Sequence, residues 1–178
     1  MKFHLETERL ILREIRDEDI EGILQLDSDP EVHKYLGNKP IITKEQAVGI
    51  IDYIKGQYDQ YGIGRWAVLE KSTGAFMGWS GLKYETEVRT DMDYYDLGYR
   101  FIKSFWGKGY ATETAKVSLE YGFNAMDLDE VYAGAHIEND GSNRVLNKMG
   151  FQMLEVFEYD GMPHNWYRLT SQDWKKRQ

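Results

Sequence analysis

Two kinds of hydrophobic spacing follow one another along the chain. Apolar and polar side chains alternate over residues 9–15, as expected for a half-buried strand. The next apolar residues share one face of a short helix, and Asp17 is its expected cap. Thr43 and Gln46 form a capping box ahead of apolar residues at helical spacing, which predicts a second helix ending near Gly62.

The rest of the chain alternates strands with helices. Residues 66–69 and 76–82 are predicted strands of a hairpin, and the polar loop 85–93 leads to a strand at 95–102 with two distinct faces. The remaining predicted elements are a helix at 110–126, a strand at 131–137, a helix at 140–149 and strands at 151–159 and 165–170. This order, βααβββαβαββ, predicts one α/β (α+β) domain over residues 1–178, with a mixed sheet of about seven strands and helices on both faces.

Composition narrows the classes of function. The 178 residues carry a formal net charge of -8, which argues against nucleic acid as a general partner. Cysteine is absent and the four histidines are scattered, so no metal site is expected. The first residues lack the apolar run of a signal peptide, and no stretch is long enough to span a membrane. We expect a cytoplasmic protein without a membrane partner.

The turn within residues 99–112 is the first candidate binding site. A strand leads into a turn that contains Gly107 and Gly109, and a helix begins directly after it. Unpaired N–H groups and the helix dipole favour an anion there, and glycine allows a close approach. The turn predicts either a pyrophosphate site or a tight turn without a ligand. A Walker A pattern is absent, and Thr112 stands where a dinucleotide-binding loop carries its third glycine.

Three segments carry a resemblance to a known family. They are the first predicted strand with the residues before it (5–13), the glycine turn with the start of its helix (106–113), and the segment from Asn139 through Ser142 to the Gly-Phe exit (139–151). Together they resemble the GNAT superfamily of N-acetyltransferases, most closely its branch of ribosomal-protein alanine N-acetyltransferases. They match the opening strand of that branch, the family's Q/R-x-x-G-x-G/A loop with Trp106 in place of Gln or Arg, and its fourth-helix motif. The similarity extends over nearly the whole chain and implies an N-acetyltransferase.

The resemblance also implies where acetyl-CoA, the cosubstrate, binds. The sheet would splay between the strands at 95–102 and 131–137, and the pantetheine of the acyl-CoA would lie in the split beside the backbone of Phe101 and Ile102. One of these two N–H groups would bond the thioester carbonyl. The other implied contacts are the pyrophosphate with the amides of Gly107, Lys108, Gly109, Tyr110, Ala111 and Thr112, the pantetheine with Asn139 and Ser142, and a CoA phosphate with Lys148. A solvated lysine at the end of a helix is the alternative for Lys148.

Catalytic residues follow less directly from the resemblance. Many family members carry a tyrosine on the fourth helix as the general acid, but Leu146 occupies that position here. Ser142, one turn earlier, is the candidate group that assists the departing sulfur. Asp96 matches an acidic position on the central strand and is the leading candidate base, directly or through a water. A carboxylate bonded to nearby backbone is the alternative, and His164 and Tyr167 are more remote candidates.

The acceptor is an amine whose identity the sequence leaves open. The loop 85–93 holds Glu85, Glu87, Asp91 and Asp93 against the single cation Arg89, and it precedes the strand that would hold the thioester. An acidic rim favours cations, so a cationic amine is expected, whereas a loop that serves only solubility is the alternative. A protein N-terminus, a polyamine, an amino acid and an aminated antibiotic are all candidates. A non-catalytic acyl-CoA sensor is the alternative function. The sequence leaves the oligomeric state open between a monomer and a homodimer.

Overall fold

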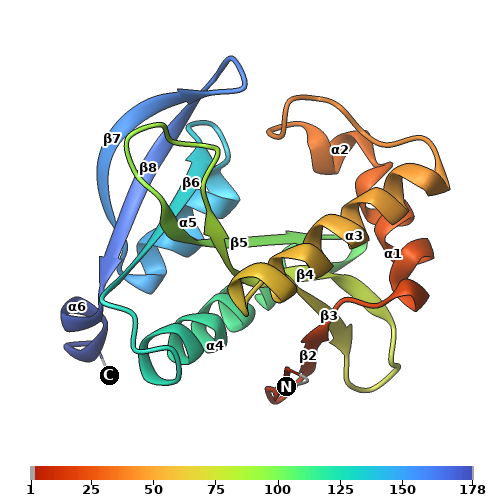
Figure 1. Cartoon of the computed structure of the whole chain (residues 1–178), viewed down its shortest axis with the longest axis horizontal. Helices are drawn as coiled ribbons and strands as arrows, with labels where there is room; N and C mark the ends of the chain where they lie inside the picture. The colour runs from red at the N-terminus through yellow and green to blue at the C-terminus, as the bar shows by residue number, and fades with distance from the viewer. Residues whose placement is uncertain (1–2, 178) are drawn as a thin grey trace.

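The computed structural model describes residues 3–177, whose centre is an eight-stranded mixed sheet (Figure 1). The strands are β1 (His4–Glu6), β2 (Leu10–Glu14), β3 (Trp66–Glu70), β4 (Phe76–Glu85), β5 (Tyr94–Phe101), β6 (Glu130–His136), β7 (Gln152–Tyr159) and β8 (Met162–Thr170). Their order in the sheet is β1-β2-β3-β4-β5-β6-β8-β7, and only β5 and β6 are parallel neighbours. The predicted domain 1–178 includes residues 1, 2 and 178, which lie outside the described range.

Helices cover both faces of this sheet, as predicted. They are α1 (Ile20–Asp27), α2 (Pro30–His33), α3 (Lys44–Tyr61), α4 (Tyr110–Asn124), α5 (Asp140–Met149) and α6 (Ser171–Lys175), with short 3₁₀ helices η1 (Asp17–Asp19) and η2 (Lys103–Phe105). Alternation along β3 separates the two faces. Trp66 and Val68 pack with α4 and α5 in the main core, whereas Ala67 packs with α1 and α3.

The predicted mixed sheet is present, and it has eight strands because the three-residue β1 pairs with β2. The expected cap, however, was wrong. The N-cap of α1 is Asp19, whose carboxylate accepts from the Arg16 N–H at 2.8 Å. Asp17 instead pairs with Lys55 of α3. The predicted caps of α3 are present: Thr43 accepts from the Gln46 N–H, and Gly62 ends the helix with φ 69°.

The sheet splays between β5 and β6. The ladder between these strands contains the single register pair Asp96 and Tyr132. Beyond that pair β6 continues with β8, and β5 continues with β4. The backbone of β5 that follows Asp96 therefore faces a gap on the β6 side, where the resemblance placed the pantetheine.

Candidate active site

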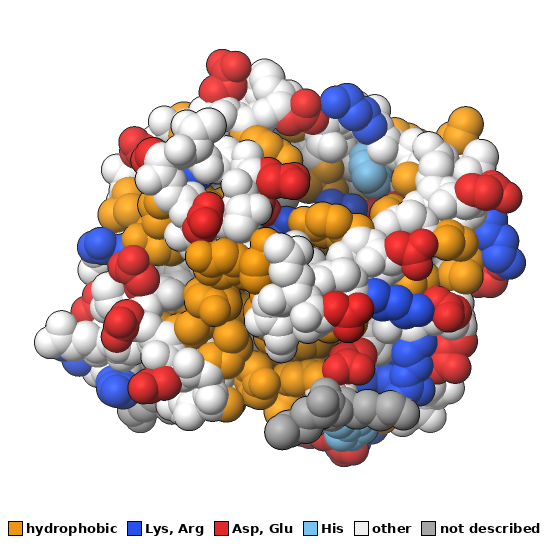
Figure 2. Space-filling model, in the orientation of Figure 1, with side chains coloured by type: hydrophobic (Ala, Val, Ile, Leu, Met, Phe, Trp, Pro, Cys, Tyr) orange, Lys and Arg blue, Asp and Glu red, His pale blue; other side chains and the backbone are white. Residues whose placement is uncertain are grey.

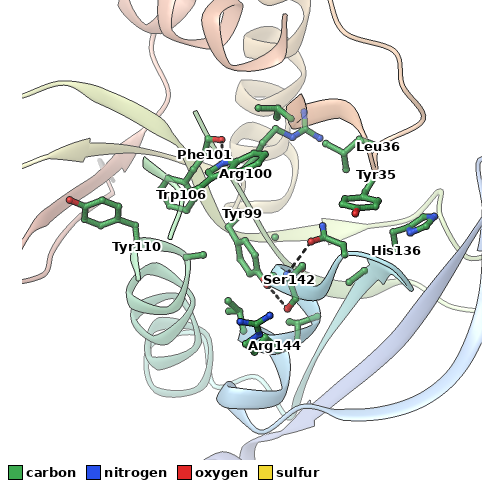
Figure 3. A pocket seen from close by; sticks show the side chains of 18 of the residues that line it. Tyr35, Leu36, Tyr99, Arg100, Phe101, Trp106, Tyr110, His136, Ser142 and Arg144 are labelled. Atoms are coloured by element: carbon green, nitrogen blue, oxygen red, sulfur yellow. Dashed lines mark hydrogen bonds between the residues drawn. The ribbon is translucent and has the colours of Figure 1, made fainter. Parts of the chain in front are cut away.

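A cleft of about 800 Å³ opens at the split between β5 and β6. Its walls come from α2 and the chain after it on one side, and from β6, β8 and α5 on the other (Figure 3). The walls meet above the cleft: the ring centroids of Tyr35 and His136 are 5.1 Å apart, and Lys39 pairs with Asp160 at 3.2 Å. The cleft is therefore a bounded passage through the middle of the sheet.

Most of the site residues expected from the sequence line this cleft. The lining includes Asp96, Phe101, Gly107, Gly109, Tyr110, Ala111, Thr112, Asn139, Ser142 and Lys148. Ile102 and Lys108 are not part of it. Lys148 is exposed in the last turn of α5, a position that suits both a phosphate contact and a solvated lysine. The fold thus gathers residues from three separate segments around one space.

The glycine turn has the geometry of an anion site. Gly107 and Gly109 have φ of 72° and 82°, a left-handed conformation that side chains with a Cβ rarely adopt. Gly109 is the N-cap of α4, and no side chain caps the first amides of that helix. These N–H groups and the positive end of the helix dipole suit a pyrophosphate.

The side chain of Arg9 holds this turn in place, a contact that the sequence did not predict. Its Nη1 donates to the Lys108 carbonyl at 3.0 Å, and its Nε donates to Glu113 of α4 at 2.7 Å. Its guanidinium also lies 4.3 Å from the ring centroid of Tyr110. Arg9 lies about a hundred positions earlier in the sequence, so only the fold brings it here. The turn is therefore held in shape before any ligand binds.

The backbone of β5 distinguishes Phe101 from Ile102. The Ile102 N–H donates to the Met77 carbonyl of β4 at 2.9 Å, so it is unavailable on the cleft side. Hydrogen bonds of an antiparallel pair alternate along the strand, so the Phe101 N–H points away from β4, toward the split. The Phe101 carbonyl accepts from the Trp106 indole at 2.7 Å. Of the two candidate amides, that of Phe101 faces the split, whereas that of Ile102 is engaged with β4.

Ser142 and Asn139 lie at the start of α5. Asn139 caps the helix, and its side-chain oxygen accepts from the Ser142 N–H at 3.2 Å. The Ser142 hydroxyl lies 3.0 Å from the phenol oxygen of Tyr99 on β5. The same phenol lies 3.2 Å from the Ser142 carbonyl. Figure 3 shows Tyr99 reaching across the cleft floor to Ser142, a contact that sequence reasoning missed because the residues are 43 positions apart.

Asp96 lies on the opposite face of β5 from Tyr99. Its carboxylate pairs with Arg65, whose guanidinium also donates to the Asp96 carbonyl at 2.7 Å. Burial raises the pKa of Asp96, against the opposing charge of Arg65. Arg100, on the same face of β5, lies over Trp79 and donates to the buried Asp27 at 2.6 Å. The carboxylate therefore borders the cleft but is already engaged by a cation.

His164 also borders the cleft, at the start of β8. Its Nδ1 lies 2.9 Å from the Met162 carbonyl, which favours the tautomer with the proton on Nδ1. Burial lowers the pKa of His164, so the ring is neutral near pH 7. Tyr167 does not line the cleft, because its hydroxyl donates to Asn143 at 2.7 Å on the other face of the sheet.

The acidic loop between β4 and β5 is partly neutralised. Glu85 is buried, pairs with Lys83 and accepts from the Glu87 N–H. Arg89 bridges Asp91 and Glu155 at 2.9 and 2.6 Å. Glu87 and Asp93 are exposed, and Asp91 is exposed despite its pairing with Arg89. Figure 2 shows acidic side chains on the rim of a hollow in this face, with basic groups deeper inside.

A second cavity, of about 330 Å³, adjoins the cleft on this face. Aromatic rings form much of its wall, and it shares Asp96 and His164 with the cleft. An acceptor in this cavity would approach the split from the side opposite to α4.

Among residues 3–177, no helix is long and apolar enough to cross a membrane, and no three acidic or histidine side chains gather as metal ligands.

Comparison with known proteins matches the sequence to one family. Residues 9–152 match the family model described as acetyltransferase (GNAT) domain. The chain is 33% identical over 165 residues to the uncharacterized N-acetyltransferase YoaA of Bacillus subtilis, covering 90% of this chain and 92% of that protein. It is 28% identical over 163 residues to the spermidine N(1)-acetyltransferase of Escherichia coli, covering 89% and 83%.

A solved structure agrees with these sequence matches. Spermidine N-acetyltransferase of Vibrio cholerae, in complex with CoA and spermine, has a TM-score of 0.76 at 16% identity and covers 95% of this chain and 99% of that one. At this identity the likeness concerns the fold. The segment matched by the family model contains the glycine turn, β5 and α5. The chain therefore belongs to the GNAT acetyltransferase family, whose members are enzymes that use acetyl-CoA.

Proposed function

We propose that the protein transfers the acetyl group of acetyl-CoA to a primary amine by direct attack in a ternary complex. The observation that carries the proposal is the cleft through the sheet. The glycine turn offers an anion site on the α4 side, and a cavity bordered by Asp96 opens on the other side. Two substrates approaching from opposite faces would meet at the split between β5 and β6.

The residues of the cleft would share the chemistry as follows. Amides of the turn hold the pyrophosphate, and Asn139 and Lys148 contact the rest of the cofactor. The Phe101 N–H donates to the thioester carbonyl as charge develops there, an effect of about 3 kcal/mol. Asp96 accepts the proton of the acceptor ammonium, directly or through a water, so that a neutral amine attacks. Ser142 donates a hydrogen bond to the departing sulfur.

A cationic amine is the acceptor class that we propose. The exposed acids of the loop between β4 and β5 support it, as do the names of the similar spermidine acetyltransferases. A protein N-terminus is the alternative suggested by the resemblance to the ribosomal-protein alanine branch. The cytoplasmic location stays a prediction.

Thiol release from acetyl-CoA in the presence of different amines tests the proposal. The panel includes polyamines, amino acids, their neutral analogues and N-terminal peptides. We expect release above the rate of hydrolysis for at least one cationic amine, with the acetylated amine detected by mass spectrometry. Tight CoA binding without turnover for any amine would favour the sensor.

Asp96→Asn is expected to flatten the acidic limb of the pH profile of kcat/KM. Burial raises the pKa of Asp96 above its ordinary value of 3.8, so the wild-type rate should fall as pH drops through this raised pKa. A protonated carboxyl accepts no proton, and asparagine accepts none at any pH. The measurement is kcat/KM against pH, within the range where thermal melting shows both proteins folded.

Asp93→Asn is the matched control, because it removes an exposed acid of the preceding loop. Its profile should keep the wild-type shape. A limb that survives in Asp96→Asn but disappears in His164→Asn would transfer the role of base to His164. A limb that survives in both variants would show that the amine loses its proton to solvent.

Neutralising Glu87, Asp91 and Asp93 together, to Gln, Asn and Asn, should raise KM for a cationic amine by roughly three- to ten-fold at low salt. An acidic rim raises the local concentration of cations, and added salt screens this effect. The wild-type KM should therefore rise with ionic strength, and the variant's should stay nearly flat.

The matched control neutralises three acids at the far end of the molecule, Glu120, Asp127 and Asp129, at and beyond the end of α4. This variant has the same net charge, so it separates the effect of the rim from that of total charge. If both variants change KM equally, the loop has no specific part in choosing the substrate.

A further inference from the structure

The fold supplies a phenol where α5 lacks one. Leu146 occupies the position of α5 at which many family members carry a tyrosine, and it is buried in the core. Tyr99 enters from the neighbouring strand β5 and places its hydroxyl 3.0 Å from the Ser142 hydroxyl. A phenol thus reaches the first turn of α5 from another element of the fold.

Tyr99 is held firmly in this position. Its ring packs against the main core between β5, α4 and α5, on the face of β5 opposite to Asp96. Its hydroxyl lies within hydrogen-bond distance of both the carbonyl and the hydroxyl of Ser142. Burial raises the pKa of Tyr99, although the bond with Ser142 opposes the shift. The phenol therefore keeps its proton, which it can donate to either of the two Ser142 oxygens.

We propose that Tyr99 is a positioning residue that donates its hydrogen bond to Ser142 and so turns the Ser142 proton toward the departing sulfur. This inference rests on the proposed acetyl transfer. A hydroxyl oxygen that accepts one hydrogen bond becomes a better donor through its own hydrogen. Without Tyr99 the Ser142 hydroxyl rotates freely and can turn its proton to its own helix instead.

The chemistry needs no net proton transfer from Tyr99. The amine nitrogen forms a bond to the acetyl carbon and loses a proton to solvent, the carbon–sulfur bond breaks, and its electron pair stays on sulfur. A thiol has an ordinary pKa of about 8.5, below that of the buried phenol, so the proton stays on Tyr99. The hydrogen bond from Ser142 stabilises the developing thiolate, which takes its proton from solvent after leaving.

A cycle of two substitutions measures this connection. Removing a single hydrogen bond of this kind typically costs about ten-fold in rate, so Tyr99→Phe should lower kcat by roughly five- to twenty-fold. KM for acetyl-CoA should stay within about two-fold, because Tyr99 acts on the leaving sulfur rather than on binding. Once Ser142→Ala is present, adding Tyr99→Phe should lower kcat by no more than about two-fold.

Tyr167→Phe is the matched control. Tyr167 is a buried tyrosine whose hydroxyl bonds Asn143, the residue after Ser142, but it does not line the cleft. Its removal loosens α5 by a comparable hydrogen bond without touching Ser142. We expect Tyr167→Phe to lower the melting temperature. In the double variant with Ser142→Ala, the two fold-losses in kcat should multiply, as for independent sites.

Three outcomes distinguish the possible failures. Losses from Tyr99→Phe and Ser142→Ala that multiply, as those of independent sites do, overturn the proposal for Tyr99 and leave the proposed function intact. A Tyr99→Phe effect confined to KM or to melting temperature overturns it as well. Wild-type protein that releases no thiol with any amine overturns the proposed function and this inference together.

Discussion

Ser142→Ala is expected to lower kcat by roughly ten- to a thousand-fold while the affinity for acetyl-CoA changes little. The hydroxyl lies at the cleft, at the start of α5, where the thioester sulfur would be. It matters only when charge develops on that sulfur, so its loss should affect the transition state and not the bound ground state. Pre-steady-state and steady-state rates of thiol release, with calorimetry of acetyl-CoA binding, measure the two effects separately.

Ser118→Ala is the matched control for this substitution. Ser118 is fully buried on α4, and its hydroxyl donates to the Thr114 carbonyl at 2.7 Å, away from the cleft. Its loss should lower stability without a specific effect on kcat. Near-normal turnover by Ser142→Ala would mean that the reaction relies on substrate positioning and the Phe101 amide alone.

Local signals made much of the fold predictable from sequence. Helix caps act over three or four residues, so Thr43, Gly62, Asn139 and Gly150 indicated closely where α3 and α5 begin and end. The glycine turn before α4 was equally local, since positive φ at Gly107 and Gly109 follows from residue type. The resemblance to the family added the split in the sheet, which no short-range pattern contains.

Strand ends were harder to predict because they depend on partners. β8 begins at Met162 rather than near residue 165, because Asp160 and Gly161 form a tight turn with φ of 50° and 73°. The added residues include Pro163, which pairs with Glu158 in the ladder. This extension is what brings His164 to the cleft.

Contacts over long sequence distances set the chemical character of the site and were not predictable. The sequence indicated Asp96 as the candidate base. Its partner Arg65 precedes β3 and lies 31 positions earlier in the chain, so no local pattern connects the two residues. The brace from Arg9 and the phenol of Tyr99 likewise depend on the assembled sheet. Sequence patterns identify which residues border a cleft, whereas the pairing among them follows from the packing of the whole chain.

Gly109→Val should weaken binding of CoA and of acetyl-CoA alike, by roughly ten- to a hundred-fold. Gly109 has φ 82°, which a β-branched residue adopts only at a cost of about 1–2 kcal/mol. The turn can relieve that strain only by rotating the peptide groups that lead into α4, and this moves the amides proposed to hold the pyrophosphate. Because the acetyl group lies far from this turn, calorimetry should find the same loss for both ligands.

Gly74→Val separates this effect from strain in general. Gly74 has φ 73° in the exposed hairpin between β3 and β4, and an added Cβ would meet nothing within 4 Å. The two valine variants therefore carry a similar backbone cost, and only one of them lies at the cleft. A Cβ on Gly109 would come no closer than 3.5 Å to Arg9, so crowding by the protein adds little at either site. If Gly74→Val weakens CoA binding as much as Gly109→Val does, the loss comes from lowered stability, and the pyrophosphate does not rest on the turn before α4.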